Sequence, residues 1–528
     1  MLILEDNSNL DIKLNEQEDL PKKISAIDQI IEQLKPKEVP IKNFKVAFIH
    51  DEFTTQHGIM ILSAVLKQHG FQTDVFITEF IKESIADEIV QFKPDVIACS
   101  TMTPGFRSVM NLVGKLKERL PGVFVVMGGS HPTLFPDMFE KEKDLDAICI
   151  SEGEYPMVEL CTSLHEGKLR TDIRNMWIRN GDEIIKNKSR PFIEDIDSLP
   201  FPDRDVYFNR YPDLAQRDFK FMTDRGCPFD CSYCFNKQMR DLQEGSFVRY
   251  NTTERAIAEI RYVTQNYHVK WVSFTDDTFN ANKEKLQNFL TLYKKEIGIP
   301  YICRIRIDLT DEDQIRLLKD TGVDRITIGL EHGNYDFRKK YLYRDMANEK
   351  IVQFGKWCRD LKIRLHTNNI FGFPDETMEL AWDTVNLNME IKPELASSFL
   401  LAPYPGTDIH KYSEKTGHLP ENFSFEDLSG HHSWTDTNFK IKSEIQNPKI
   451  REMTNLRCFT MILVFIPWIK PLVKILIKLP PNPFYEFLMH MSGNMRVSWP
   501  YANWKERLIL IRRMVFLFTK WDSEKIPA

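Results

Sequence analysis

The sequence alternates short, almost wholly apolar runs with helical segments, and it does so in two separate stretches. In the first stretch, residues 43–180, the apolar runs are FKVAFIH, DVIACS, VFVVMGG and DAICI. Runs of this kind are typical of strands buried on both faces, and their alternation with helices predicts a parallel sheet covered on both sides. We therefore predict a flavodoxin-like (Rossmann-like) α/β domain, whose ligands should sit beyond the carboxyl ends of its strands.

The second stretch, residues 216–412, repeats the strand-then-helix pattern over about 190 residues. Its six strand-like runs are KFMTDRG, WVSFTDD, YICRIRI, RITIGLEHG, IRLHTNNIFGF and LASSFLLAPY. This repetition predicts a parallel barrel, complete or partial, of the TIM type, with its working face at the carboxyl ends of the strands. Polar residues end most of these runs, as such a face requires.

Three segments flank or join these domains. Residues 1–42 form a polar extension with one short helical period, and residues 181–215 form a proline-containing linker. Residues 413–528 are predicted to be mostly helical. There, Lys470, Lys474 and Lys478 recur every four residues beside Leu, Ile and Val, in an apolar stretch too short to span a bilayer. The pattern fits a core helix with a solvated Lys edge, a lid over an apolar pocket, or an interfacial helix.

Composition and charge narrow the class of protein. The net charge is 70 − 76 = −6, so bulk electrostatics gives no reason to expect a nucleic-acid partner. The first twenty residues are rich in acids where a secretory signal would be basic and apolar. Nine cysteines, an odd number and mostly scattered, suit a reducing compartment. We therefore expect a cytoplasmic protein.

Three of the nine cysteines lie within eight residues, directly after the first strand of the second stretch. Cys227, Cys231 and Cys234 can converge on one loop. Structural zinc sites prefer four ligands, and no fourth Cys or His follows within thirty residues. Iron-sulfur clusters also use thiolates, and a cubane held by only three of them leaves one iron open to a substrate or cofactor.

The spacing Cys-x3-Cys-x2-Cys, with Tyr233 before the third cysteine, resembles the signature of the radical SAM superfamily. That family places the motif after the first strand of a partial (β/α)6 barrel. The resemblance implies that Cys227, Cys231 and Cys234 hold a 4Fe-4S cluster. It also implies that the open iron binds S-adenosylmethionine, which is cleaved to a 5′-deoxyadenosyl radical.

Other barrel positions are assigned by the same resemblance. Asp276 and Asp277 occupy the place of a polar run, often Gly-Gly-Glu, with which the family contacts the methionine amino group. Glu331 ends its strand in the same way as a family Glu that helps to position S-adenosylmethionine. Alternation places Arg304 and Arg306 on one side of the third strand, and only one of them, Arg306 in our assignment, need be functional. Asn369, on the fifth strand, is expected at the top of the barrel.

The first domain resembles the cobalamin-binding domain that precedes many radical SAM barrels. Its Met127–Thr133 segment contains Gly128 and Gly129 at a strand end, and Ser151–Glu154 contains Glu152 and Gly153 after the next strand. Glycines there let the backbone approach a bulky ligand. The hydroxyl groups of the neighbouring strand end, from Ser100, Thr101 and Thr103, are expected to add hydrogen bonds to cobalamin.

One motif of cobalamin domains is missing. The classical Asp-x-His-x-x-Gly, whose His ligates cobalt, does not fit the spacing of residues 50–58. Many cobalamin-dependent radical SAM proteins lack it as well. We therefore favour His57 as a loop residue over His57 as a cobalt ligand, and His131 as structural.

The resemblance implies a reaction in which methylcobalamin supplies a methyl group to a substrate carbon radical. Two alternatives stay open: an oxidative cyclase resembling the anaerobic magnesium-protoporphyrin ester cyclases, and a non-catalytic iron-sulfur or corrinoid-binding protein. The apolar C-terminal region suggests a hydrophobic small-molecule substrate, such as a lipid, polyprenoid or tetrapyrrole, and peripheral membrane contact at the cytoplasmic face. An external electron donor such as flavodoxin or ferredoxin is also expected.

Overall fold

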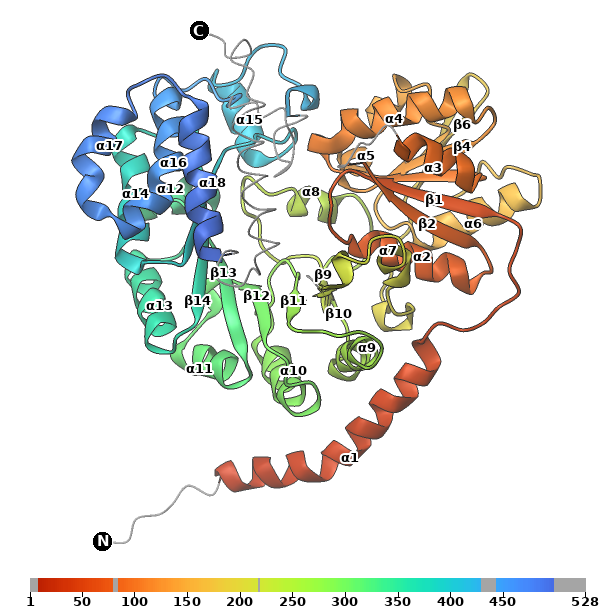
Figure 1. The fold of residues 1–528 in the computed structure, drawn as a ribbon, viewed down its shortest axis with the longest axis horizontal. Helices are drawn as coiled ribbons and strands as arrows, with labels where there is room; N and C mark the ends of the chain where they lie inside the picture. The colour runs from red at the N-terminus through yellow and green to blue at the C-terminus, as the bar shows by residue number, and fades with distance from the viewer. Residues whose placement is uncertain (1–7, 79–83, 217–218, 429–442, 498–528) are drawn as a thin grey trace.

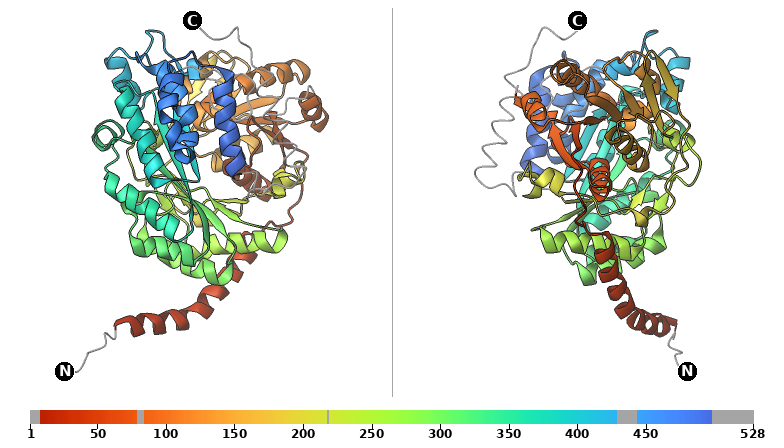
Figure 2. Two further views of the ribbon diagram at one scale, coloured as in Figure 1. Left: turned by 60° about the vertical axis from the view of Figure 1, so that its left-hand side comes forward. Right: turned by 90° about the vertical axis from the view of Figure 1, so that its right-hand side faces the viewer.

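The computed structural model describes residues 8–78, 84–216, 219–428 and 443–497 (Figure 1). Two α/β units lie side by side, joined by a connector, and a helical region packs on the second unit (Figure 2). We call residues 45–186 the first domain and residues 219–400 the second domain. No helix among the described residues combines the length and apolarity that crossing a bilayer would need.

The first domain is built on a seven-stranded sheet in the order β2-β1-β3-β4-β5-β6-β7. Strands β1 to β5 are parallel in the flavodoxin order, as predicted, and β6 and β7 add an antiparallel hairpin to the far edge. Because β7 lies in the sheet, the domain extends past residue 180, where we expected the linker to begin. The strands are β1 Lys45–His50, β2 Gln72–Ile77, β3 Val96–Ser100, β4 Phe124–Gly128, β5 Ala147–Cys149, β6 Met176–Asn180 and β7 Glu183–Lys186.

Helices cover both faces of this sheet, which explains why its central strands β3 and β4 are almost wholly apolar. One face packs against α2 and α6, and the other against α3 and α4, each with its own buried apolar cluster. The short α5 follows β4 directly. The helices are α2 His57–Gln68, α3 Ser84–Phe92, α4 Phe106–Arg119, α5 Ser130–Leu134 and α6 Glu154–His165.

The second domain contains a six-stranded parallel sheet whose strands are neighbours in chain order, β8-β11-β12-β13-β14-β15. This is the partial barrel that the sequence predicts. All six strands run the same way, so their carboxyl ends form one rim. The strands are β8 Phe219–Phe221, β11 Val272–Phe274, β12 Tyr301–Ile305, β13 Val323–Glu331, β14 Arg364–Phe371 and β15 Leu395–Leu400; β9 Asp224–Arg225 pairs with β10 Arg249–Tyr250.

Polar side chains begin most of the barrel helices, because residues such as Thr252, Asn282 and Asp311 accept a hydrogen bond from the first turn. Helices α9, α10, α11 and α13 bury apolar side chains in the core cluster that also contains the strands, whereas α8 buries none. The helices are α8 Asn236–Asp241, α9 Thr253–Asn266, α10 Lys283–Glu296, α11 Glu312–Asp320, α12 Tyr335–Leu342, α13 Asn348–Asp360, α14 Met378–Ile391 and α15 Asp408–Lys415.

The remaining elements lie against these two domains. Helix α1 (Ser8–Leu34) packs its last turns on α9 through the buried Ile27 and Leu34 (Figure 1). The connector between the two domains, residues 187–216, is partly buried. Its Phe201 and Tyr207 lie in the core cluster that the two domains share. In the C-terminal region, α16 and α18 pack on one another and on β15. Its helices are α16 Ile450–Phe465, α17 Lys470–Leu476 and α18 Pro483–Val497.

Candidate active site

The three clustered cysteines lie on the loop that leaves the barrel rim after β8 and β9. All three are free thiols; Cys231 is buried, whereas Cys227 and Cys234 are half-buried. The loop begins at Gly226, whose φ of 84° and close contact with the Phe247 carbonyl exclude any larger side chain. A turn closed by the Cys234 amide, which donates to the Cys231 carbonyl at 3.0 Å, brings the last two thiols to the same side.

Two guanidinium groups contact the middle cysteine. Arg306 donates from Nη1 to Cys231 Sγ at 3.5 Å, and Arg344 does so at 3.4 Å. Burial raises the pKa of the Cys234 thiol to about 12, and it also raises the pKa of Cys227, against the hydrogen bond with Thr278. Metal binding has to displace these protons, and the two cations favour the thiolate that results.

Glu331 lies beside this pair of cations in a strained conformation. Its φ is +64°, in the left-handed region, where β13 bulges against β14. Burial raises the pKa of the Glu331 carboxyl, while Arg344 and a hydrogen bond from Tyr233 oppose the rise. A side chain on Gly329 would collide with that carboxylate. Non-glycine residues held in this region cluster at functional sites, so the strain supports the role expected of Glu331.

The two aspartates after β11 have different surroundings. Asp276 is buried, and its Oδ1 accepts bonds from the Thr223 amide at 2.7 Å and the Asp224 amide at 2.8 Å. It thus anchors the chain that leads into the cysteine loop. Asp277 is exposed, accepts a bond from Asn236 at 3.1 Å, and interacts electrostatically with Cys227 and Cys234. Asp277 is therefore the one of the two that faces the cysteines.

Asn369 does not lie at the rim, contrary to our expectation. Its amide is fully buried, accepts from Asn388 of α14 at 2.7 Å, and donates to the Ser397 carbonyl at 2.9 Å. The side chain thus points to the outer helix layer. Because side chains alternate along a strand, its neighbour Asn368 takes the barrel-interior face.

Four of the residues predicted to bind cobalamin lie at or just after the carboxyl ends of strands β3 and β4. Ser100 ends β3 and Gly128 ends β4, and the two are paired in register. Gly129 has a φ of 97° and lies against the Thr101 backbone, so its conformation serves this local packing. The Thr101 hydroxyl donates to the Met102 carbonyl, and the exposed Met102 leaves apolar surface at the same edge.

Glu152 and Gly153, also predicted to bind cofactor, take part in packing and ion pairing. Glu152 Oε1 accepts from Arg225 at 2.6 Å and from Arg249 at 2.8 Å, and both arginines belong to the second domain. Arg225 also donates to Glu154 at 2.7 Å. A Cβ on Gly153 would crowd Leu62. This loop therefore ties the first domain to the residue that precedes the cysteine loop.

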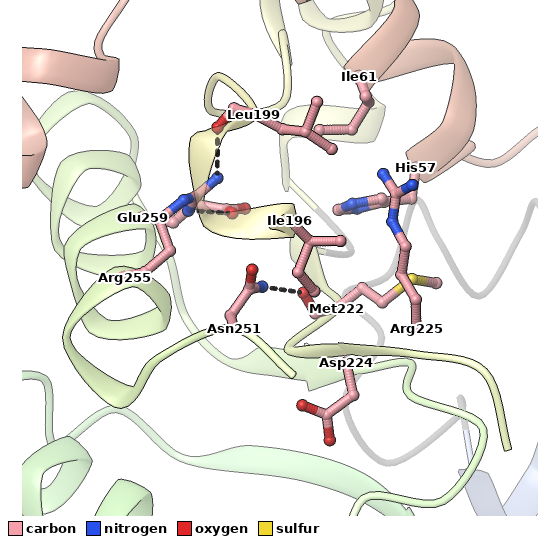
Figure 3. Close-up of a pocket in the computed structure, with 10 residues that line it drawn as sticks. All are labelled: His57, Ile61, Ile196, Leu199, Met222, Asp224, Arg225, Asn251, Arg255 and Glu259. Atoms are coloured by element: carbon pink, nitrogen blue, oxygen red, sulfur yellow. Dashed lines mark hydrogen bonds and ion pairs between the residues drawn. The ribbon is translucent and has the colours of Figure 1, made fainter. Parts of the chain in front are cut away.

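A small polar cavity between the domains lies next to this ion-pair network (Figure 3). His57 faces it from α2, opposite Glu259 and Arg255, which pair with one another at 3.1 Å. Burial lowers the pKa of His57 to about 4, so the ring is neutral. Its neighbours are thus the charged side chains of α9. His57 is the first residue of α2, not the loop residue expected from the sequence.

His131 sits in an aromatic cluster at the start of α5. Its Nδ1 is 3.1 Å from Thr103 Oγ1, and its ring centroid lies 4.0 Å from that of Phe106 and 4.9 Å from that of Phe425. Phe425 comes from the segment that follows the second domain, so this cluster joins that segment to the first domain.

The carboxyl ends of β3 and β4 face the cysteine loop. Helix α5, which follows Gly129, contacts α8, which begins two residues after Cys234. Figure 1 shows these two helices on the facing sides of the domains. A ligand bound at the carboxyl ends of β3 and β4 would therefore be close to a ligand bound at the cysteines.

The residues present fit the cofactors that the sequence implies. The charges of the three thiols affect one another, as expected of side chains that share one site. Among the described residues, no three His, Cys, Asp or Glu side chains converge on a single-ion position. Three thiols suit an iron-sulfur cluster that leaves one iron open to a cofactor. The glycine-bearing strand ends and the exposed Met102 suit a bulky, partly apolar ligand.

Arg344 is the site residue that sequence reasoning missed. It follows α12, more than 100 residues from Cys231, and it also donates to the Gly329 carbonyl at 2.7 Å. No local motif marks it; only its burial as a charged residue, which the sequence does not reveal, distinguishes it from surface arginines.

Comparison with known families agrees with this geometry. The family model for the radical SAM superfamily matches residues 223–387, and that for the B12 binding domain matches residues 52–161. The first match contains the cysteine loop and most of the barrel strands. The second contains the β3 and β4 ends.

Individual proteins are similar to this chain in sequence or in fold. The uncharacterized methyltransferase PH0819 of Pyrococcus horikoshii is 25% identical over 397 residues, which are 75% of this chain and 82% of that protein. The anaerobic magnesium-protoporphyrin IX monomethyl ester cyclase of Rubrivivax gelatinosus is 25% identical, covering 70% of this chain and 67% of that one. The methyltransferase TsrM of Kitasatospora setae, solved with cobalamin and a 4Fe-4S cluster, superposes with a TM-score of 0.64 at 14% identity, covering 90% of this chain and 99% of that chain.

The barrel and its cysteine loop define a radical SAM enzyme. The chain carries a B12-binding domain in front of its radical SAM domain, and in this domain order it is similar to cobalamin-dependent radical SAM enzymes. Its cofactors are a 4Fe-4S cluster, S-adenosylmethionine and cobalamin.

Proposed function

We propose that this enzyme methylates an unactivated carbon of a hydrophobic substrate. The observation that carries the proposal is the contact between α5 and α8, because it brings the carboxyl ends of β3 and β4, where we propose that cobalamin binds, near the cysteine loop. When bound, the cofactors supply a substrate carbon radical and a methyl group for it. The relatedness to PH0819 supports the same reaction class.

The residues near the cysteines are assigned roles by their contacts. Cys227, Cys231 and Cys234 hold the cluster, and Arg306 and Arg344 stabilise its charge through Cys231. Tyr233, Asp277 and Glu331 are placed to bind S-adenosylmethionine, with Asp276 as a structural support of the loop. In the first domain, we assign cobalamin binding to the residues at the ends of β3 and β4, which are Ser100, Thr101, Gly128 and Gly129. The ion pairs of Glu152 favour a tie between domains over cofactor contact.

Apolar side chains border the barrel rim and support a hydrophobic substrate. Ile370 of β14 and Phe399 of β15 lie in the carboxyl halves of the last two strands and are only half-buried. A lipid, polyprenoid or tetrapyrrole is the class of molecule that would cover such side chains.

An external protein is proposed as electron donor, of the flavodoxin or ferredoxin class. The six cysteines outside the loop are buried and dispersed, and within the described ranges they form no second metal-binding group. Such a donor would supply the electron that reduces the cluster. The free state of all nine thiols supports the proposal of a reducing, cytoplasmic location.

The test uses anaerobically reconstituted enzyme with cobalamin, a low-potential reductant, and S-adenosylmethionine labelled with a deuterated methyl group. A total lipid extract serves as the substrate pool. Label in a solvent-extractable product, with both S-adenosylhomocysteine and 5′-deoxyadenosine formed, supports the proposal. Label only in water-soluble product would contradict the substrate class. Cys231→Ala should abolish product, and Cys303→Ala, at a buried cysteine of β12, is the matched control.

An oxidative cyclase is the second candidate, favoured by the relatedness to the Rubrivivax cyclase. It predicts 5′-deoxyadenosine without label transfer in the same assay. Formation of neither product would leave a cofactor-binding protein without catalysis, and both enzyme proposals would be wrong.

A further inference from the structure

The hairpin between α16 and α18 exposes a row of large apolar side chains. Trp468 is 79% exposed, Leu472 53%, Ile475 65% and Leu479 47%. Their spacing of four, three and four residues places them on one side of α17 and its flanking turns. We call these four residues the apolar stripe. Phe484, at the start of α18, is also exposed.

The apolar stripe takes no part in the packing of the core. A different side of α17 is already buried, because Val473 and Ile477 belong to the apolar cluster formed with α16 and α14. The helix is therefore apolar both toward the protein and toward solvent. Single exposed apolar residues are ordinary, but a row of this length marks a surface that is covered in use.

The charged side chains of the segment that carries the apolar stripe are all positive. Lys474 and Lys478 are exposed next to it. Lys470 lies one turn earlier, where its amine donates to Asn386 at 2.6 Å. The sequence contains no Asp or Glu between Glu452 and Glu486, and Glu486 is buried against Arg457. A basic rim around an apolar face with an exposed Trp is the composition of a helix that lies in a membrane interface.

From these observations we infer that the apolar stripe, with Lys474 and Lys478, docks on the surface of an anionic lipid bilayer. The bilayer is favoured over a second copy of this chain, because two copies meeting here would bring their lysines together. Helix α17 lies on the side of the barrel away from the first domain (Figures 1 and 2), so docking leaves the interface between domains uncovered. The inference goes beyond methyl transfer and uses none of the cofactor residues.

The experiment is flotation of the full-length protein with lipid vesicles. One set contains phosphatidylcholine alone, and the other contains about one-third phosphatidylglycerol. The protein should float with the anionic vesicles and much less with the neutral ones. Replacement of Lys474 and Lys478 by Glu should weaken binding at least about fivefold for each lysine removed. Leu472→Gln with Ile475→Gln should weaken it on either lipid.

Matched controls separate the apolar stripe from general effects. Ile41→Gln removes an apolar side chain that is equally exposed elsewhere, and charge reversal of Lys411 and Lys415 repeats the four-residue spacing on α15. Both controls should float like the wild type. Unchanged thermal unfolding of each variant will show that the fold is intact.

Three results would overturn the inference: no flotation of the wild type, flotation that the stripe variants leave unchanged, or flotation lost equally in the controls. A wild type that is dimeric in solution, with monomeric stripe variants and no lipid binding, would instead assign the surface to a second copy. Because vesicle binding is measured without turnover, failure here and failure of the methylation assay are distinguishable.

Discussion

Glu152 of the first domain binds Arg225, the residue two positions before the first cysteine of the triad, at 2.6 Å. The same carboxylate oxygen binds Arg249 at 2.8 Å, and its other oxygen accepts from the Ile193 amide. One side chain of the first domain thus fixes the start of the cysteine loop, the strand paired with it, and the connector. We therefore expect the position of the β3 and β4 ends relative to the triad to depend on this residue.

Removal of the Glu152 carboxylate should loosen the contact between domains. Glu152→Ala leaves the buried Arg249 without a carboxylate and Arg225 with Glu154 alone. Breaking a buried ion pair in this way costs up to about 3–5 kcal/mol. We expect a clear fall in the melting temperature and faster proteolysis in the connector. Glu140→Gln breaks an ion pair with Lys186 that is exposed, so it should leave the melting temperature unchanged. Equal melting temperatures for the two variants would contradict the role assigned to Glu152.

The charge of Arg344 should tune the cluster. A cation beside Cys231 stabilises the reduced, more negative state, so Arg344→Gln should lower the reduction potential. A loss of about 1.4 kcal/mol corresponds to about 60 mV for one electron. The measurement is a redox titration followed by electron paramagnetic resonance. Arg316→Gln, on the exposed face of α11, is the control, and a potential that moves equally in both variants would contradict the assignment.

Asp276 should make the stability of the cofactor-free protein depend on pH. Burial raises its pKa from 3.8 to about 7. Between these values the folded state keeps a proton that the unfolded state has released, so stability should fall as pH rises from about 4 to about 7 and then level off. Asp276→Asn should flatten this dependence in thermal unfolding. An unchanged slope would contradict the raised pKa.

Asp276 also has a purely structural contribution, which a second variant isolates. Asp276→Ala removes the acceptor of the Thr223 and Asp224 amides. Leaving these buried donors unpaired costs about 1–3 kcal/mol each. We therefore expect a lower melting temperature at every pH, in contrast to the pH-dependent effect of Asn.

Sequence patterns sufficed where the physics is local. The cysteine spacing identifies the cluster loop, and the strand-then-helix rhythm gives both sheets because buried parallel strands must be apolar. Long-range pairing is not visible in this way. Neither Arg344, which reaches Cys231 across the fold, nor Glu152, whose partners lie more than 70 residues away, carries a local signal. The sequence does not fix the face of β14 on which Asn369 lies, because a shift of one residue along a strand moves a side chain from the barrel interior to the helix layer.

The pair Asn368 and Asn369 tests that reversal directly. Asn369→Ala should cost about 1–3 kcal/mol, because the buried Asn388 amide then loses an acceptor, and it should leave S-adenosylmethionine cleavage by the folded enzyme unchanged. Asn368→Ala, on the barrel-interior face, should change cleavage or substrate affinity with little effect on the melting temperature. The two residues are adjacent, identical and on one strand, so each variant is the control for the other. Loss of cleavage in Asn369→Ala at full stability would return that residue to the rim.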